Sequence, residues 1–106
     1  MLTRNDILNR APTIETVSAF ELGEGATLGV KLLSAAEFMA MSSDPRSKGD
    51  KAYAAWLLAC VCDEAGKPVF ATDDFDALTS LPFTLVNRLI EVAQKINGTT
   101  ETAAKN

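Results

Sequence analysis

An apolar run at residues 52–62 constrains this chain more than any other feature of its sequence. The run is well short of the ~20 apolar residues that a membrane-spanning helix needs. It predicts a buried helix over about 50–62, with Asp50 at the end of the helix that favours a negative charge. A helix without a polar face must be covered on every side. Either neighbouring elements of the same chain enclose this helix, or part of it meets another subunit.

The composition narrows the class of protein. The chain has 106 residues, of which 47% are hydrophobic and 23% charged, as expected of one globular domain. We predict that this domain spans 1–98 and that 99–106, which lacks bulky apolar residues, is a flexible tail. The net charge of −4 and the scattered Lys and Arg residues argue against nucleic-acid binding. The polar start MLTRNDILNR does not fit a signal peptide, so we expect a cytoplasmic protein that binds no membrane.

The sequence shows no pattern typical of a catalytic or metal-binding site. It contains no histidine, so Cys60 and Cys62 lack the usual partner for a nucleophile or a zinc site. The acidic residues Asp73, Asp74 and Asp76 lack the spacing of a calcium loop and favour helix capping instead. We therefore expect a protein that is not an enzyme, needs no cofactor or metal, and acts through its surfaces.

The N-terminal half is predicted to contain a β-hairpin. Strand-like sequence at 13–20 and 27–33 flanks the glycine-rich reversal Gly23-Glu24-Gly25. Gly29 would weaken the second strand or mark a bulge. Before the hairpin, Pro12 disfavours a helix that runs through the first dozen residues.

A capping box predicts where the first helix begins. Ser34 can accept a hydrogen bond from the backbone of Glu37, whose carboxylate can bond back to the backbone of Ser34. The helix should run from Ala35 to about Met41, and the following SSDPRSKG reads as a loop.

The C-terminal half is predicted to be mainly helical. After a turn at Gly66 and a short extended piece at 68–70, Thr72 can cap a short acidic helix. A long helix should start at 80 or 81 and stop at Gly98. The predicted fold class is thus α+β, with an N-terminal β-hairpin or small antiparallel sheet packed with about four helices.

The long C-terminal helix carries more apolar surface than one core-facing stripe needs. Its apolar positions fill roughly 200° of its circumference, against a stripe of about 100°. Either neighbours within the chain cover both flanks, or the edge bearing Leu81, Leu85 and Val92 meets a partner. We predict these three as partner-binding residues, for a client protein or for a homo-oligomer.

The order of these motifs resembles the tail assembly chaperones of long-tailed bacteriophages. The resemblance begins with LTRNDIL and LLSAAEF and is densest over 59–98, where DEAGKPVF, DDFDAL and NRLIEVAQKING follow one another. It implies a protein that binds the tape measure protein, helps to recruit tail tube subunits and is absent from the finished virion.

The resemblance also implies a possible second product. In many relatives a backward ribosomal frameshift by one nucleotide yields an extended form that engages the tube protein. Ala104-Lys105-Asn106 can be encoded by a slippery heptamer, and reading the gene would test this hypothesis. The alternatives are a small structural head–tail connector or tail-completion protein, and a cytosolic adaptor unrelated to phage.

Overall fold

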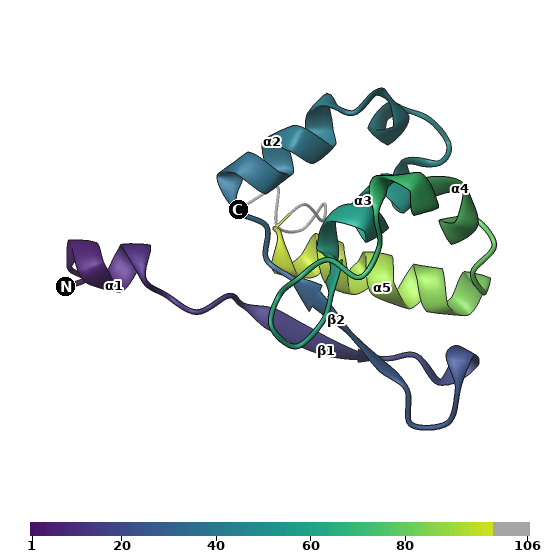
Figure 1. Ribbon diagram of the computed structural model, residues 1–106, viewed down its shortest axis with the longest axis horizontal. Coiled ribbons are helices and arrows are strands. Elements are labelled where there is room, and N and C mark those ends of the chain that lie inside the picture. The colour runs from purple at the N-terminus through teal and green to yellow at the C-terminus, as the bar shows by residue number, and fades with distance from the viewer. Residues whose placement is uncertain (99–106) are drawn as a thin grey trace.

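A small antiparallel sheet lies against a set of helices in the computed structural model of this protein, which describes residues 1–98 (Figure 1). The sheet has the order β1-β2-β3, with strands β1 (Ile14–Ser18), β2 (Thr27–Lys31) and β3 (Val61–Cys62). The predicted flexible tail at 99–106 and the proposed slippery codons at its end lie outside the described residues.

Helices make up most of the chain after the hairpin, and the predicted α+β class is confirmed. The α-helices are α1 (Arg4–Leu8), α2 (Ala35–Ser43), α3 (Ala52–Cys60), α4 (Phe75–Leu78) and α5 (Phe83–Ile96). Three single 3₁₀ turns are η1 (Phe20–Leu22), η2 (Pro45–Lys48) and η3 (Thr72–Asp74).

Helix α3 is enclosed by other parts of the same chain. It packs against α2, α4, α5 and β2, and its Leu57 and Cys60 are almost completely buried. Trp56 is half-buried, with its ring edge-to-face against Phe38 at 6.2 Å between centroids. Of the two alternatives for this apolar run, enclosure by neighbouring elements is the one that the structure shows.

The end of α3 corrects the predicted helix over 50–62. The helix spans Ala52–Cys60, and Val61 leaves it with extended backbone angles of −73° and 123°. Val61 and Cys62 then pair with β2 as a third strand, and the Val61 carbonyl accepts a hydrogen bond from Val69. Hydrophobicity alone could not separate these two states, because a buried helix end and a buried strand are equally apolar.

Gly29 of β2 lies between Thr16 of β1 and Cys62 of β3, in an unbroken antiparallel register that contains no bulge. A Cβ added at Gly29 would meet the Cys62 carbonyl oxygen and the Ile14 side chain, each at 2.9 Å. The glycine therefore allows close approach between strands, and the alternative of a bulge is wrong.

The helix caps were predicted with mixed success. The Ser34–Glu37 capping box is present in both directions, at 3.1 and 2.9 Å. Thr72, however, does not cap the acidic helix; there the Asp74 carboxylate accepts a hydrogen bond from the Ala71 amide at 2.8 Å.

An N-terminal arm, residues 1–13, stands away from the body of the molecule (Figure 1). All of its residues are exposed. The arm contains α1, a short helix that sequence analysis did not predict, which a second capping box between Thr3 and Asp6 stabilises.

Candidate interaction surface

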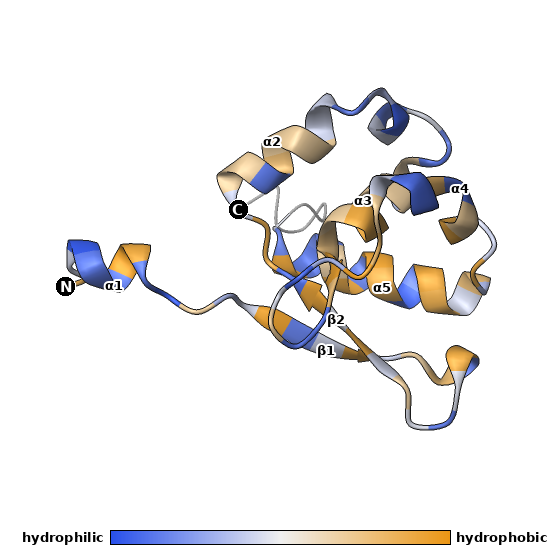
Figure 2. Ribbon diagram, in the orientation of Figure 1, coloured by the Kyte–Doolittle hydropathy of each residue, from blue (hydrophilic) through white to orange (hydrophobic). Residues whose placement is uncertain are grey.

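Helix α5 buries one stripe of its surface and leaves a second one accessible. Leu85, Leu89 and Ala93 form the buried stripe, which faces α3 and strands β1 and β2. Figure 2 shows hydrophobic residues recurring along α5, as an amphipathic helix requires.

The position of Leu85 corrects the predicted partner-binding edge. Leu85 is 0% exposed, so it belongs to the core and cannot present an apolar edge to a partner. Val92 is half-buried against the core, and Leu81 is half-buried in the turn before α5. Whether Leu81 and Val92 contact a partner stays a prediction.

The β1–β2 hairpin covers the flank of α5 that bears Thr84 and Arg88, as one of the two alternatives had it. The Arg88 guanidinium donates to both carboxylate oxygens of Glu21, at 2.9 and 3.0 Å, and to the Ser18 carbonyl at 2.8 Å. It also lies over the ring of Phe20, 4.7 Å from the ring centroid, as in a cation–π contact. The Thr84 hydroxyl donates to the same Glu21 carboxylate. The hydrogen bonds from Arg88 lower the pKa of Glu21 to about 2.

The accessible apolar surface lies on the opposite flank of α5. An open groove of about 320 Å³ there, the α5 groove, runs between the start of α3, the α4–α5 turn and α5. It is lined mostly by apolar side chains: Tyr53, Thr79, Leu81, Phe83, Val86, Asn87 and Ile90. Phe83 lies at the rim of the α5 groove and is 78% exposed. Leaving so large an apolar side chain in water is unfavourable in free energy.

Of the three predicted residues, the structure places only Leu81 in this groove. Sequence reasoning missed Phe83, Val86 and Ile90 because their positions on the helix circumference gave no sign of which flank the hairpin covers. The excess of apolar positions on α5 is present in the structure as the lining of this groove, and whether the groove binds a partner stays a prediction.

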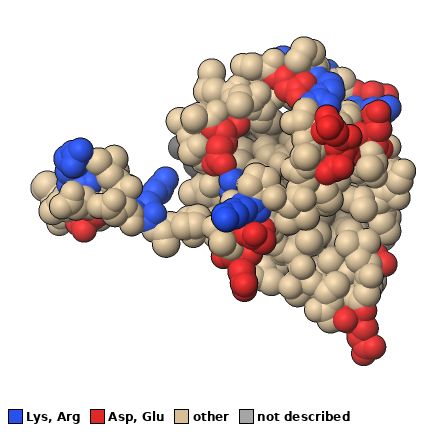
Figure 3. All heavy atoms as spheres, in the orientation of Figure 1, with Lys and Arg blue, Asp and Glu red and all other residues tan. Residues whose placement is uncertain are grey.

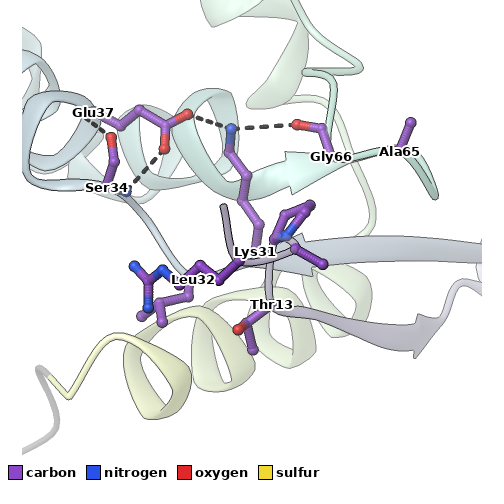
Figure 4. A pocket seen from close by; sticks show the side chains of 10 residues that line it. Thr13, Lys31, Leu32, Ser34, Glu37, Ala65 and Gly66 are labelled. Carbon is purple, nitrogen blue, oxygen red and sulfur yellow. Dashed lines mark hydrogen bonds and ion pairs between the residues drawn. The ribbon is translucent and has the colours of Figure 1, made fainter. Parts of the chain in front are cut away.

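A second hollow, of about 260 Å³, lies between the arm, β2 and the start of α2 (Figure 4). Lys31 extends through it and is only 7% exposed. Its ammonium group pairs with the Glu37 carboxylate and donates to the Gly66 carbonyl at 3.3 Å. The hydrogen bond from Lys31 lowers the pKa of Glu37. Both bonds join Lys31 to other groups of the same chain, so the Lys31 side chain holds α2 and the Gly66 turn against β2.

The two cysteines are packed as small apolar residues. Burial raises the pKa of Cys60 to about 12 and also raises the pKa of Cys62. Over residues 1–98, no cluster of three His, Cys, Asp or Glu side chains could hold a metal ion. Within the same residues, no helix combines the length and hydropathy needed to cross a membrane.

Asn97 is a structural residue that sequence analysis did not identify. Its amide oxygen accepts a hydrogen bond from the Leu33 amide at 2.9 Å, and its amide nitrogen donates to the Ala93 carbonyl at 2.8 Å. It therefore joins the end of α5 to the chain after β2, before Gly98 (φ +69°) ends the helix. A partner 64 residues away leaves no local sequence signal.

Comparison with solved structures gives an informative match. No family model matches this chain, and no curated protein matches it in sequence. Among solved structures, the bacteriophage HK97 tail assembly chaperone superposes with a TM-score of 0.64 and 17% sequence identity, over 87% of this chain and 88% of that one. At this identity the match shows a common fold, which is that of the HK97 protein over nearly its whole length.

Proposed function

We propose that this protein is a tail assembly chaperone of a long-tailed bacteriophage. The observation that carries the proposal is the fold shared with the HK97 tail assembly chaperone across 87% of the chain. The motifs over 59–98 support the same family independently, since they were recognised from the residues alone. The likeness supports a role in tail assembly, and the finer roles below extend it.

The protein that this chaperone binds, its client, is the tape measure protein. A helical segment of that protein binds in the α5 groove. Grooves lined by apolar side chains accept the apolar face of an amphipathic helix. Phe83 at the rim and Ile90 farther along α5 supply two anchoring positions, and Leu81 supplies a third. The hydroxyl of Thr79 and the amide of Asn87 border the groove and can bond to polar groups of the client.

The remaining parts of the proposal follow from this role. The protein has no catalytic activity, binds no nucleic acid and needs no cofactor. It acts in the cytoplasm of the host bacterium and is not retained in the mature virion. Tail tube subunits are recruited to the complex, through a frameshifted extended form where the gene encodes one.

Disrupting the gene in its phage tests this proposal. We expect complete heads without tails, and restoration of tails when the protein is supplied from a plasmid. Mass spectrometry of purified wild-type particles should not detect the protein. Detection at a fixed number of copies per particle would contradict the proposal and favour a structural head–tail connector or tail-completion protein.

Co-expression gives a second test that does not need the virion. The tape measure protein encoded beside this gene should become soluble only when the chaperone is present. A tape measure protein that is equally insoluble with and without it would count against a chaperone role.

A further inference from the structure

Strand β1 is an outer strand of the three-stranded sheet, with β2 on one side only (Figure 1). The β1–β2 ladder continues past both strand ends: the Leu32 amide donates to the Thr13 carbonyl at 2.9 Å, and the Ala19 amide to the Ala26 carbonyl at 2.8 Å. Hydrogen-bonded pairs alternate along an antiparallel ladder, so the odd-numbered residues of β1 bond to β2. The even-numbered residues therefore turn their backbone N–H and C=O groups to the open side of the sheet.

Only part of this open side is free. The Ser18 carbonyl accepts a hydrogen bond from Arg88 at 2.8 Å, so α5 covers that end of the edge. At the opposite edge of the sheet, the Val69 amide donates to β3 at 3.2 Å. Within residues 1–98, Ile14 and Thr16 form the uncovered stretch, the free edge, with two backbone donors and two acceptors. The free edge contains none of the lysine, proline or bulges that usually protect an edge strand.

Glu15 determines which strand can add to the free edge. It is exposed between Ile14 and Thr16, and its carboxylate takes part in none of the ion pairs among residues 1–98. If a second copy added its own free edge in antiparallel fashion, Ile14 would pair with Thr16 and Glu15 would lie directly opposite Glu15. Like charges at opposed positions destabilise a sheet, whereas a cation opposite a glutamate stabilises it. The free edge is therefore unfavourable for a second copy and favourable for a cationic strand.

An open hollow of about 430 Å³ adjoins the free edge. Ile14 and Thr16 line it together with Gly29 and Cys62, which share their face of the sheet, and with Val69, which is 46% exposed. Alternate side chains of an added strand would lie beside this hollow, and the side chains between them would lie on the face that bears Glu15.

The charge of the whole chain favours the same kind of partner. The chain carries 14 Asp and Glu residues against 10 Lys and Arg residues, and Figure 3 shows acidic side chains on several parts of the body. A segment with lysine or arginine is attracted to such a surface before it docks.

We propose that the free edge of β1 binds an extended, cationic segment of a partner protein, which adds to the sheet as a further antiparallel strand. Its backbone bonds to Ile14 and Thr16, its lysine or arginine lies opposite Glu15, and its apolar or β-branched side chains lie beside the hollow. The contact is short, so it is weak by itself and supplements other contacts with the same partner. The inference concerns a surface separate from the α5 groove and does not rest on the proposed client.

Two synthetic peptides serve as probes. Both alternate threonine and valine and are blocked at their ends, and they differ only in a central lysine or glutamate. Each is titrated into the full-length, ¹⁵N-labelled protein and followed by NMR. The lysine peptide should shift the amide signals of Ile14, Thr16 and Ser18 and slow the hydrogen exchange of the Thr16 amide. The glutamate peptide should bind about two- to fivefold more weakly.

Four variants locate the site. Thr16→Pro removes an outward amide hydrogen without removing a β1–β2 hydrogen bond, and Thr16→Val keeps that hydrogen as its control. Glu15→Lys reverses the charge on the free edge, and Glu24→Lys makes the same change at an exposed position in the hairpin turn. Thr16→Pro should bind neither peptide, and Glu15→Lys should prefer the glutamate peptide. Thr16→Val and Glu24→Lys should bind like the wild type.

The proposal fails if neither peptide shifts the amides of the free edge, or if Glu15→Lys keeps the preference of the wild type. The second outcome decides the matter even where Thr16→Pro does not fold. A folded Thr16→Pro that binds like Thr16→Val would also overturn it. Protein that dimerises through these amides without peptide would assign the free edge to a second copy instead. Co-expression with the tape measure protein judges client binding separately from all of these results.

Discussion

The Arg88 guanidinium on α5 donates one hydrogen bond to each carboxylate oxygen of Glu21 in the β1–β2 hairpin, at 2.9 and 3.0 Å, although the two residues lie 67 positions apart in the sequence. This pair fixes the hairpin on one flank of α5 and leaves the other flank to the groove. The architecture of the proposed binding surface thus depends on a bidentate ion pair on the face opposite to it.

Stability should depend on pH through Glu21. Its pKa falls from an ordinary 4.5 to about 2 in the folded protein because Arg88 donates to the charged carboxylate. The stabilisation is therefore complete above about pH 4.5 and is lost as the pH falls toward 2. Urea unfolding of wild type and Glu21→Gln should show a difference in free energy of unfolding at neutral pH that shrinks across this window. The exposed Glu24→Gln serves as a control on the same loop, and a wild type–Glu21→Gln difference that is constant with pH would contradict the prediction.

Substitutions at Leu85 and at Phe83 should differ in their effect on the free energy of unfolding. Leu85→Ala leaves a cavity in the core and should cost about 2–5 kcal/mol of unfolding free energy. Phe83→Ser changes an exposed side chain and should change that free energy by about 0.5 kcal/mol or less. Denaturant unfolding measures both, and equal losses in the two variants would show that the burial of α5 is misassigned.

Gly29→Ala should destabilise the sheet by about 1–3 kcal/mol, because its Cβ would meet backbone and side-chain atoms at 2.9 Å. Gly49→Ala is the matched control, since nothing lies within 4 Å of a Cβ placed there. Thermal unfolding compares the two, and a Gly29→Ala protein as stable as the control would rule out the close approach of β3.

Cys60 should resist alkylation in the folded protein. Only the thiolate reacts, and both burial and a pKa of about 12 keep this thiol protonated and inaccessible. Peptide mapping after iodoacetamide treatment should find Cys60 modified rapidly in denaturant and hardly at all in native buffer. Rapid native modification would require an opening that the structure does not contain.

Local signals explain what could be predicted from the sequence. Ser34 and Glu37 lie three residues apart, so their reciprocal capping could be read directly, and Gly98 at a positive φ ended the last helix as expected. These features need only neighbouring residues and a fixed helical geometry.

Long-range contacts explain what could not be predicted. The pairing of Val61 with Val30, and of Arg88 with Glu21, joins segments whose proximity is set by the whole fold. The apolar excess on α5 was visible in the sequence, but only the position of the hairpin decides that Leu85 is buried and Phe83 is exposed. The amount of free apolar surface was therefore predictable, and its location was not.

Photo-crosslinking from the groove tests the central proposal most directly. A benzophenone side chain is placed at position 83, at the rim of the α5 groove, and in a matched protein at position 39, on exposed α2. Each protein is co-expressed with the tape measure protein and irradiated. We expect a crosslink to a helical segment of the tape measure protein from position 83 and none from position 39. Equal crosslinking from both positions, or crosslinking from position 39 alone, would contradict it.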